Sequence, residues 1–113
     1  MSRIIVLDDF FPDLSTGFRI AEFGWLLRRN IVDDVYTTAS PFDELLSDFA
    51  GIEPSLASRV HAYEPMALRD ADLASMVFLN NAVHYISDLE EHSVPFVVTL
   101  YPGGGLDLGD EVT

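Results

Sequence analysis

The chain has 113 residues, enough for one domain with one hydrophobic core, and its 19 acidic and 6 basic residues give a formal charge of −13. This charge argues against a nucleic-acid partner, and the absence of cysteine and lysine excludes disulfides, thiolate nucleophiles, Schiff-base lysines and P-loop lysines. No stretch approaches the ~20 apolar residues of a membrane helix, so we expect a cytoplasmic protein without a transmembrane segment.

The first half of the chain predicts two units, each a strand followed by a helix. The expected elements are a strand over residues 3–9, a helix over 18–29, a strand over 31–39 and a helix over 41–50. Ser40 followed by Pro41 is typical of a helix start, and Gly51 is expected to end the second helix.

The second half predicts three more strands and one helix. The expected elements are a strand over residues 59–63, a strand over 74–79, a helix over 81–92 and a strand over 96–100. The first of these strands is short and half polar, which favours a position at the edge of a sheet. The last two are continuously apolar, as is typical of parallel strands covered on both faces. The helix is expected to bury Val83, Ile86 and Leu89.

These elements predict an α/β, three-layer Rossmann-like fold. Right-handed crossovers give a parallel sheet of about five strands in the order 3-2-1-4-5, in a single domain over residues 1–113. Residues 106–113 are too short and too acidic to form the helix that the fifth strand needs as cover. We expect them to be a disordered or incomplete tail, and the chain to be a fragment or half of an assembly.

Ligands of parallel sheets bind beyond the carboxyl ends of the strands, which places candidate residues in three short segments. The candidates for substrate binding are Ser15, Thr16, Gly17, Asn80, Asn81, Tyr101, Gly103 and Gly104. The segment 15–17 opens a helix and can either bind an anion or simply cap that helix. The glycines at 103–105 either let the backbone approach a ligand closely or form a flexible exit from the domain.

Two other groups of side chains carry possible chemistry. Asp8 and Asp9 follow the first strand, where they can hold Mg²⁺ or be solvated loop charges. The acidic pair evokes a response-regulator receiver domain, but the aspartate and lysine that this family needs after its third and fifth strands are absent. The three histidines share no ligand spacing, so no metal site is predicted. His84 and Tyr101 are the catalytic candidates, although an exposed surface role is the alternative for His84.

The order of motifs resembles the N-terminal, acceptor-side domain of GT-B glycosyltransferases of the family-4 type, apparently truncated. The matching segments are Ser15-Thr16-Gly17, Phe78-Leu79-Asn80-Asn81 and Pro95-Phe96-Val97-Val98-Thr99-Leu100. There are two departures from the family pattern. Phe18 follows Gly17 where the family often has a second glycine, and Tyr101 stands where the family has a histidine.

The resemblance implies a domain that binds the sugar acceptor, while a second Rossmann-like domain binds the nucleotide-sugar donor. It places Gly17 near the donor diphosphate and has Asn80, Asn81 and Tyr101 line the cleft. No tightly bound cofactor is implied, because the nucleotide-sugar is a co-substrate. The partners are then a small sugar and a missing C-terminal domain, and this chain alone is expected to be inactive.

The alternative is a non-catalytic α/β module that binds a partner protein, or a second copy of itself, through the uncovered edge of the fifth strand. The reading frame beyond Thr113 discriminates between the two hypotheses. A second α/β domain there favours the transferase, whereas a stop codon and a stable dimer favour the interaction module.

Overall fold

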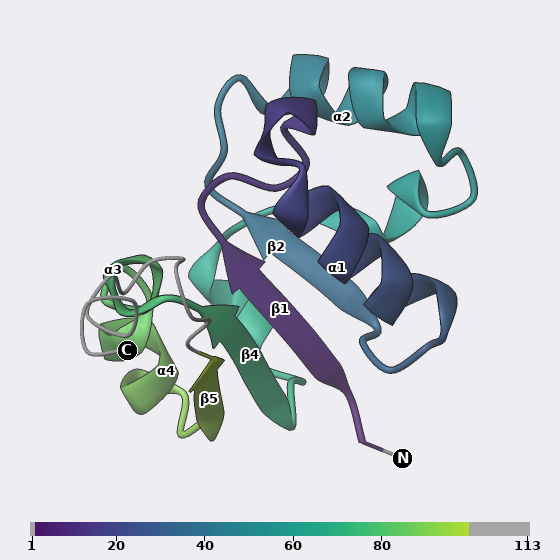
Figure 1. The fold of residues 1–113 in the computed structure, drawn as a ribbon. Coiled ribbons are helices and arrows are strands. Elements are labelled where there is room, and N and C mark those ends of the chain that lie inside the picture. The colour runs from purple at the N-terminus through teal and green to yellow at the C-terminus, as the bar shows by residue number, and fades with distance from the viewer. Residues whose placement is uncertain (1, 100–113) are drawn as a thin grey trace, which may run out of the picture.

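The computed structural model describes residues 2–99, with only the backbone described for Asn80. Its five strands form one parallel sheet in the order β3-β2-β1-β4-β5, with helices on both faces (Figure 1), which confirms the predicted α/β Rossmann-like fold. The strands are β1 (Ile4–Asp8), β2 (Asp34–Thr37), β3 (Val60–Ala62), β4 (Leu73–Val77) and β5 (Phe96–Thr99). The helices are α1 (Phe18–Arg28), α2 (Phe42–Ile52), α3 (Leu79–Ala82) and α4 (Ile86–Glu91), with short 3-10 turns at η1 (Leu14–Thr16), η2 (Ala57–Arg59) and η3 (Pro65–Leu68).

The central strand β1 pairs with β2 on one side and with β4 on the other. Val6 lies opposite Val35 of β2 and Ser75 of β4, and Met76 of β4 lies opposite Val98 of β5. All these pairs are parallel, so the carboxyl ends of the strands meet at one edge of the sheet. This edge is where ligands bind in folds of this class.

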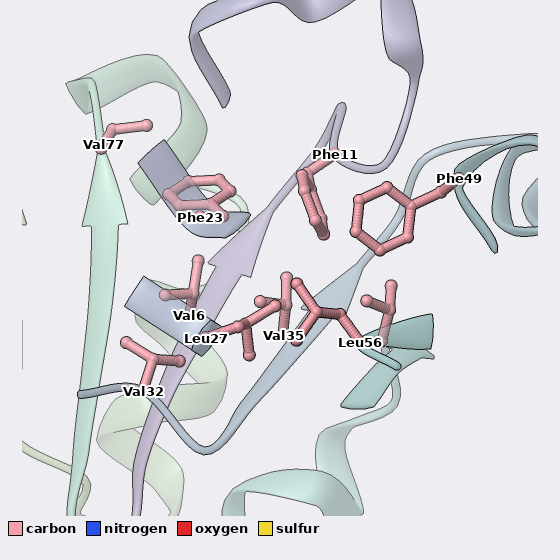
Figure 2. Close-up of a cluster of buried hydrophobic side chains, with 10 residues drawn as sticks. Val6, Phe11, Phe23, Leu27, Val32, Val35, Phe49, Leu56 and Val77 are labelled. Carbon is pink, nitrogen blue, oxygen red and sulfur yellow. The ribbon is translucent and has the colours of Figure 1, made fainter. Parts of the chain in front are cut away.

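The sheet has a hydrophobic core on each face because successive strand residues point to opposite sides. On one face, Val6 and Val35 pack beneath α1 and α2 in a cluster that includes three phenylalanines (Figure 2). The Phe11 ring meets Phe23 and Phe49 edge to face, with centroids 5.4 and 5.1 Å apart. The other core contains these buried residues: Ile5, Leu7, Leu68, Ala74, Met76, Ala82, Tyr85, Leu89 and Val94. Two buried faces explain why the apolar run in β1 is continuous.

Strand β5 lies at the edge of the sheet and is poorly covered. Its first two side chains, Phe96 and Val97, are 38% and 49% exposed, whereas Val98 packs against the core formed by α3 and α4. A lack of cover was expected for the fifth strand. The predicted tail at residues 106–113 lies outside the described residues.

The prediction of one continuous helix over residues 81–92 is wrong. The structure has α3 and α4, separated by a turn at residues 83–85. Val83 is 61% exposed instead of buried, while Tyr85 occupies the core position. The physical reason is that the turn directs both His84 and Tyr85 toward Asp9, which a continuous helix cannot do because adjacent residues lie on different faces.

The boundaries of α2 also differ from those predicted. Its N-cap residue is Pro41 and no side chain caps it, so Ser40 precedes the helix without capping it. The helix continues through Gly51 to Ile52 instead of ending near residue 50, since Phe49 anchors its last turns in the core. No helix within residues 2–99 is long and apolar enough to cross a membrane.

Candidate functional site

Four polar side chains from three parts of the chain meet at the carboxyl edge of the sheet. Asp9 follows β1, Thr38 follows β2, and His84 and Tyr85 lie in the turn between α3 and α4. We call these four residues the carboxyl-edge cluster. The parallel register places the ends of β1, β2 and β4 side by side, and this brings together residues that are up to 76 positions apart.

Asp9 is the centre of the carboxyl-edge cluster. Its Oδ1 accepts a hydrogen bond from the Thr38 hydroxyl at 2.7 Å and lies 2.8 Å from the Tyr85 hydroxyl. Its Oδ2 contacts Nδ1 of His84. The Asp9 side chain is 11% exposed and that of His84 is 60% exposed. A nearly buried carboxylate therefore holds an imidazole that faces solvent.

Tyr85 is the buried anchor of the cluster. Its hydroxyl oxygen is 2.7 Å from the backbone carbonyl of Asp8 and 2.8 Å from Asp9 Oδ1, two acceptors that share its single proton. Burial raises the pKa of Tyr85 well above its usual range, and the hydrogen bond to Asp9 and the charges of Asp9 and Asp8 raise it further. Tyr85 therefore keeps its proton at neutral pH and acts as a donor.

Asp8 has a different role because it faces the interior. Its Oδ2 accepts backbone N–H bonds from Phe10 at 2.9 Å and Phe11 at 2.8 Å, and Arg19 Nε lies within 3.0 Å of both carboxylate oxygens. The Arg19 guanidinium lies 4.8 Å from the ring centroid of Phe10 and 5.2 Å from that of Phe78. Asp8 thus fixes the loop between β1 and α1.

The carboxylates at this edge do not form a metal-binding group. Asp8 uses its oxygens on Arg19 and on two backbone N–H groups, and Asp9 uses both of its oxygens within the carboxyl-edge cluster. Across residues 2–99 no group of three or more histidine, cysteine, aspartate or glutamate side chains could hold a metal ion.

The segment Ser15-Thr16-Gly17 lies at the start of α1, where it was expected to open and cap the helix, but neither hydroxyl caps it. Ser15 donates to Asp13 from both its backbone N–H, at 2.9 Å, and its hydroxyl, at 2.8 Å, so it belongs to the turn η1. These two bonds lower the pKa of Asp13. The N-cap of α1 is Gly17, which has no capping side chain and adopts φ 30°. The helix therefore begins at a bare backbone turn.

Asn81 is a buried residue of α3. Its side-chain amide donates to the carbonyl of Leu7 at 3.1 Å, which ties α3 to β1. Its Oδ1 is buried without a hydrogen-bond partner among residues 2–99. An unpaired buried carbonyl is uncommon and identifies this point as one where a water or ligand donor would be stabilising.

The predicted site residues are only partly brought together by the structure. His84 lies in the cluster and Asn81 is buried against β1, whereas Ser15 and Thr16 form a separate turn. Tyr101, Gly103 and Gly104 lie outside the described residues, and the side chain of Asn80 is not described.

Asp9 was not expected as a partner of His84, and neither Thr38 nor Tyr85 was among the predicted site residues. Only their positions in the sequence could have indicated these residues. Thr38 directly follows the second strand, and Tyr85 directly follows His84. The other two histidines are not in the cluster. His61 of β3 contacts Asp34 through Nε2 at 2.9 Å, and His92 ends α4.

No protein-family model, curated protein or solved structure matches this chain. The interpretation of the site therefore depends on its chemistry. That chemistry is a fixed carboxylate, a solvent-facing imidazole and a buried tyrosine hydroxyl at the ligand-binding edge of a parallel sheet.

Proposed function

We propose that this chain is the acceptor-side domain of a GT-B, family-4-type glycosyltransferase. Completed by a second domain, it would transfer a sugar from a nucleotide-sugar donor to a hydroxyl of the acceptor. The observation that carries the proposal is the parallel sheet of order 3-2-1-4-5 with a polar cluster at its carboxyl edge. The sequence resemblance supplies the reaction class, and the fold is consistent with it.

The side chains at this edge suit a neutral, hydroxyl-rich acceptor. Sugar hydroxyls both donate and accept hydrogen bonds, and the edge offers an exposed imidazole at His84, while Oδ1 of Asn81 is buried without a partner among residues 2–99. A formal charge of −13 disfavours anionic acceptors over the molecule as a whole. The acceptor class that fits is therefore a neutral saccharide or other polyol.

Most of the groups that bind the donor would come from the second domain and not from this chain. We place its diphosphate near Gly17, where α1 begins without a side-chain cap and backbone N–H groups favour an anion. Binding of the nucleotide and stabilisation of the leaving diphosphate then depend on the second domain. The isolated chain is accordingly expected to bind acceptor sugars weakly and to transfer none.

The test is a nuclear magnetic resonance titration of the ¹⁵N-labelled chain with maltose, methyl glucoside and a nucleotide-diphosphate sugar. We expect the two saccharides to shift amides in residues 9–17 and 78–85 with dissociation constants of about 1 mM or weaker. His84→Ala should weaken this binding. The matched control, His92→Ala, changes a histidine at the far end of α4 and should leave binding unchanged.

Three outcomes would contradict the proposal. The first is the absence of any saccharide-dependent shift, and the second is a set of shifts confined to the opposite edge of the sheet. The third is sugar transfer, or donor binding at about 1 µM, by this chain alone, since either would remove the need for a second domain.

A second candidate function is a protein-interaction module that uses β5. Its support is the exposure of Phe96 and Val97 on the edge strand, at 38% and 49%. Edge strands with exposed apolar residues can pair with another chain. Sedimentation equilibrium would then show a dimer that Val97→Asp dissociates, without any response to saccharides. A monomer at all concentrations would exclude self-association through this edge.

A further inference from the structure

Helix α1 carries apolar side chains on its outer side as well as on the side that faces the sheet. Phe23 and Leu27 are buried in the core beneath the helix, whereas Phe18 and Trp25 are 41% and 44% exposed. A surface helix normally has polar residues opposite its buried side, and a helix that is apolar all round is normally covered on both sides. The outer side of α1 is therefore a candidate contact surface.

The exposed apolar residues of α1 lie next to positive charge. Phe18, Trp25 and Arg29 are seven and four residues apart, which places them along one side of the helix, and we call them the α1 stripe. The guanidinium of Arg29 lies 4.8 Å from the ring centroid of Trp25. Tryptophan and arginine are enriched among the residues that dominate binding at protein interfaces. Helix α1 and its C-cap residue hold three of the six basic residues of the chain and one acidic residue.

Helix α2 carries the opposite charge on its exposed side. Glu44, Asp48 and Ile52 follow one another at intervals of four residues and are all exposed, and we call them the α2 stripe. Ile52 is 55% exposed. Helix α2 and its C-cap residue, Glu53, hold four acidic residues and no basic one. The α2 stripe is thus apolar and negative, whereas the α1 stripe is apolar and positive.

Both helices cover the same face of the sheet. Phe23 and Leu27 of α1 and Phe49 of α2 belong to one core cluster (Figure 2). The ends of the two helices are joined by the ion pair between Arg28 Nη1 and Glu53 Oε1, at 2.7 Å. This face therefore presents two exposed stripes of opposite charge, each with apolar side chains.

We propose that the protein forms a two-fold symmetric dimer in which the α1 stripe of each copy packs against the α2 stripe of the other copy. A two-fold axis that runs between the two helices makes both contacts at once. Arg29 then faces Glu44 and Asp48 of the other copy, and Trp25 and Ile52 become buried. A different protein would need acidic groups opposite α1 and basic groups opposite α2, whereas a second copy supplies both. The inference does not depend on the proposed function.

The net charge of the chain sets the conditions for this dimer. Two copies with a formal charge of −13 each repel one another at long range. At 0.15 M salt the screening length is ~8 Å, so distant charges are screened while groups in contact still interact. Association is therefore best measured at this salt concentration.

The first measurement combines sedimentation equilibrium with tryptophan fluorescence of the full chain, between about 1 µM and 1 mM. Trp25 is the single tryptophan of the chain, so its emission reports on the α1 stripe alone. We expect a dimer to form, with the emission moving to shorter wavelength and acrylamide quenching falling over the same concentration range. A monomer throughout, or a dimer with unchanged Trp25 emission, would overturn the inference.

Reversal of single charges tests the pairing of the two stripes. Arg29→Glu and Asp48→Arg should each raise the dissociation constant of the dimer by about tenfold or more, because like charges then meet. An equimolar mixture of the two variants should dimerise as tightly as the wild type, because each reversed charge then meets its opposite on the other copy. This recovery would also show that both variants are folded. Two folded variants that do not associate on mixing would overturn the inference.

Two further variants serve as controls. Arg69→Glu makes the same charge change as Arg29→Glu, but at an exposed residue next to η3, on the opposite face of the sheet, and should leave the dissociation constant unchanged. Val97→Asp alters the edge strand β5 and should also leave this dimer intact. Dissociation by Val97→Asp would assign the dimer to β5 and overturn the inference, as would equal weakening by Arg69→Glu and Arg29→Glu.

Discussion

Tyr85 is the residue that best explains how the carboxyl edge is built. Its buried hydroxyl reaches the Asp8 carbonyl and the Asp9 carboxylate, and its ring packs edge to face against Tyr63 at a centroid distance of 4.8 Å. A single side chain therefore connects the turn between α3 and α4 to the end of β1. These contacts accompany the break in a helix that sequence periodicity alone predicts to be continuous.

The raised pKa of Tyr85 predicts a loss of stability at alkaline pH. The folded protein holds this proton more tightly than the unfolded chain, so the contribution is complete below about pH 10, the unfolded value, and is lost as the pH rises above it. Cysteine and lysine are absent, so tyrosine dominates titration in this range. We expect the urea midpoint to fall between about pH 9 and pH 11, and to fall less in Tyr85→Phe. An equally steep fall in Tyr85→Phe would contradict this prediction.

Two glycines, Gly17 and Gly51, have different structural roles, one at the start of α1 and the other within α2. Gly17 begins α1 at φ 30°, a conformation that side chains other than glycine rarely adopt, and a Cβ there would meet nothing within 4 Å. Gly51 lies in α2, and its Cβ would also meet open space. Because neither position is crowded, substitution at each reports on the backbone alone.

We therefore expect alanine to have opposite effects at the two positions. Gly17→Ala should lower the free energy of unfolding by about 1–2 kcal/mol, because alanine is strained at this φ. Gly51→Ala should raise it by about 0.5–1 kcal/mol, because alanine favours the helix. Urea denaturation of both variants measures the difference. Equal effects at the two positions would show that the turn before α1 differs from the one described.

Charge dominates the behaviour of the whole molecule. The formal charge of −13 arises from 19 acidic and only 6 basic residues. Within residues 2–99, arginines pair with carboxylates at Arg3–Asp34, Arg19–Asp8 and Arg28–Glu53. Most carboxylates therefore have no basic residue to offset them. The folded state brings these charges together and so carries the cost of their repulsion.

This repulsion predicts that salt stabilises the protein. The screening length is ~30 Å at 0.01 M salt and ~8 Å at 0.15 M, whereas the radius of gyration is 14.0 Å. At low salt the charges therefore interact across the whole molecule, and at the higher concentration they do not. We expect Tm to rise by several degrees over this range, equally in sodium chloride and potassium chloride. A constant or falling Tm would contradict the prediction.

The sequence by itself determined the sheet. The apolar runs around Val6 and Val77 predict parallel strands, because apolar residues without alternation are typical of strands buried on both faces. The run around Val98 also forms a parallel strand in the predicted position, although Phe96 and Val97 of this strand are exposed. The sequence also predicted the poor cover of β5. It failed for the interrupted helix over residues 81–92, which depends on side-chain partners outside the local segment.

Only the tertiary structure decided the candidate site. Asp9 meets Thr38 across 29 positions and Tyr85 across 76, and no local pattern connects them. Periodicity reports which side chains are buried, since burial depends on a residue's place within its own strand or helix. The pairing of polar side chains depends instead on strand register and loop conformation, which are set by the packing of the whole chain.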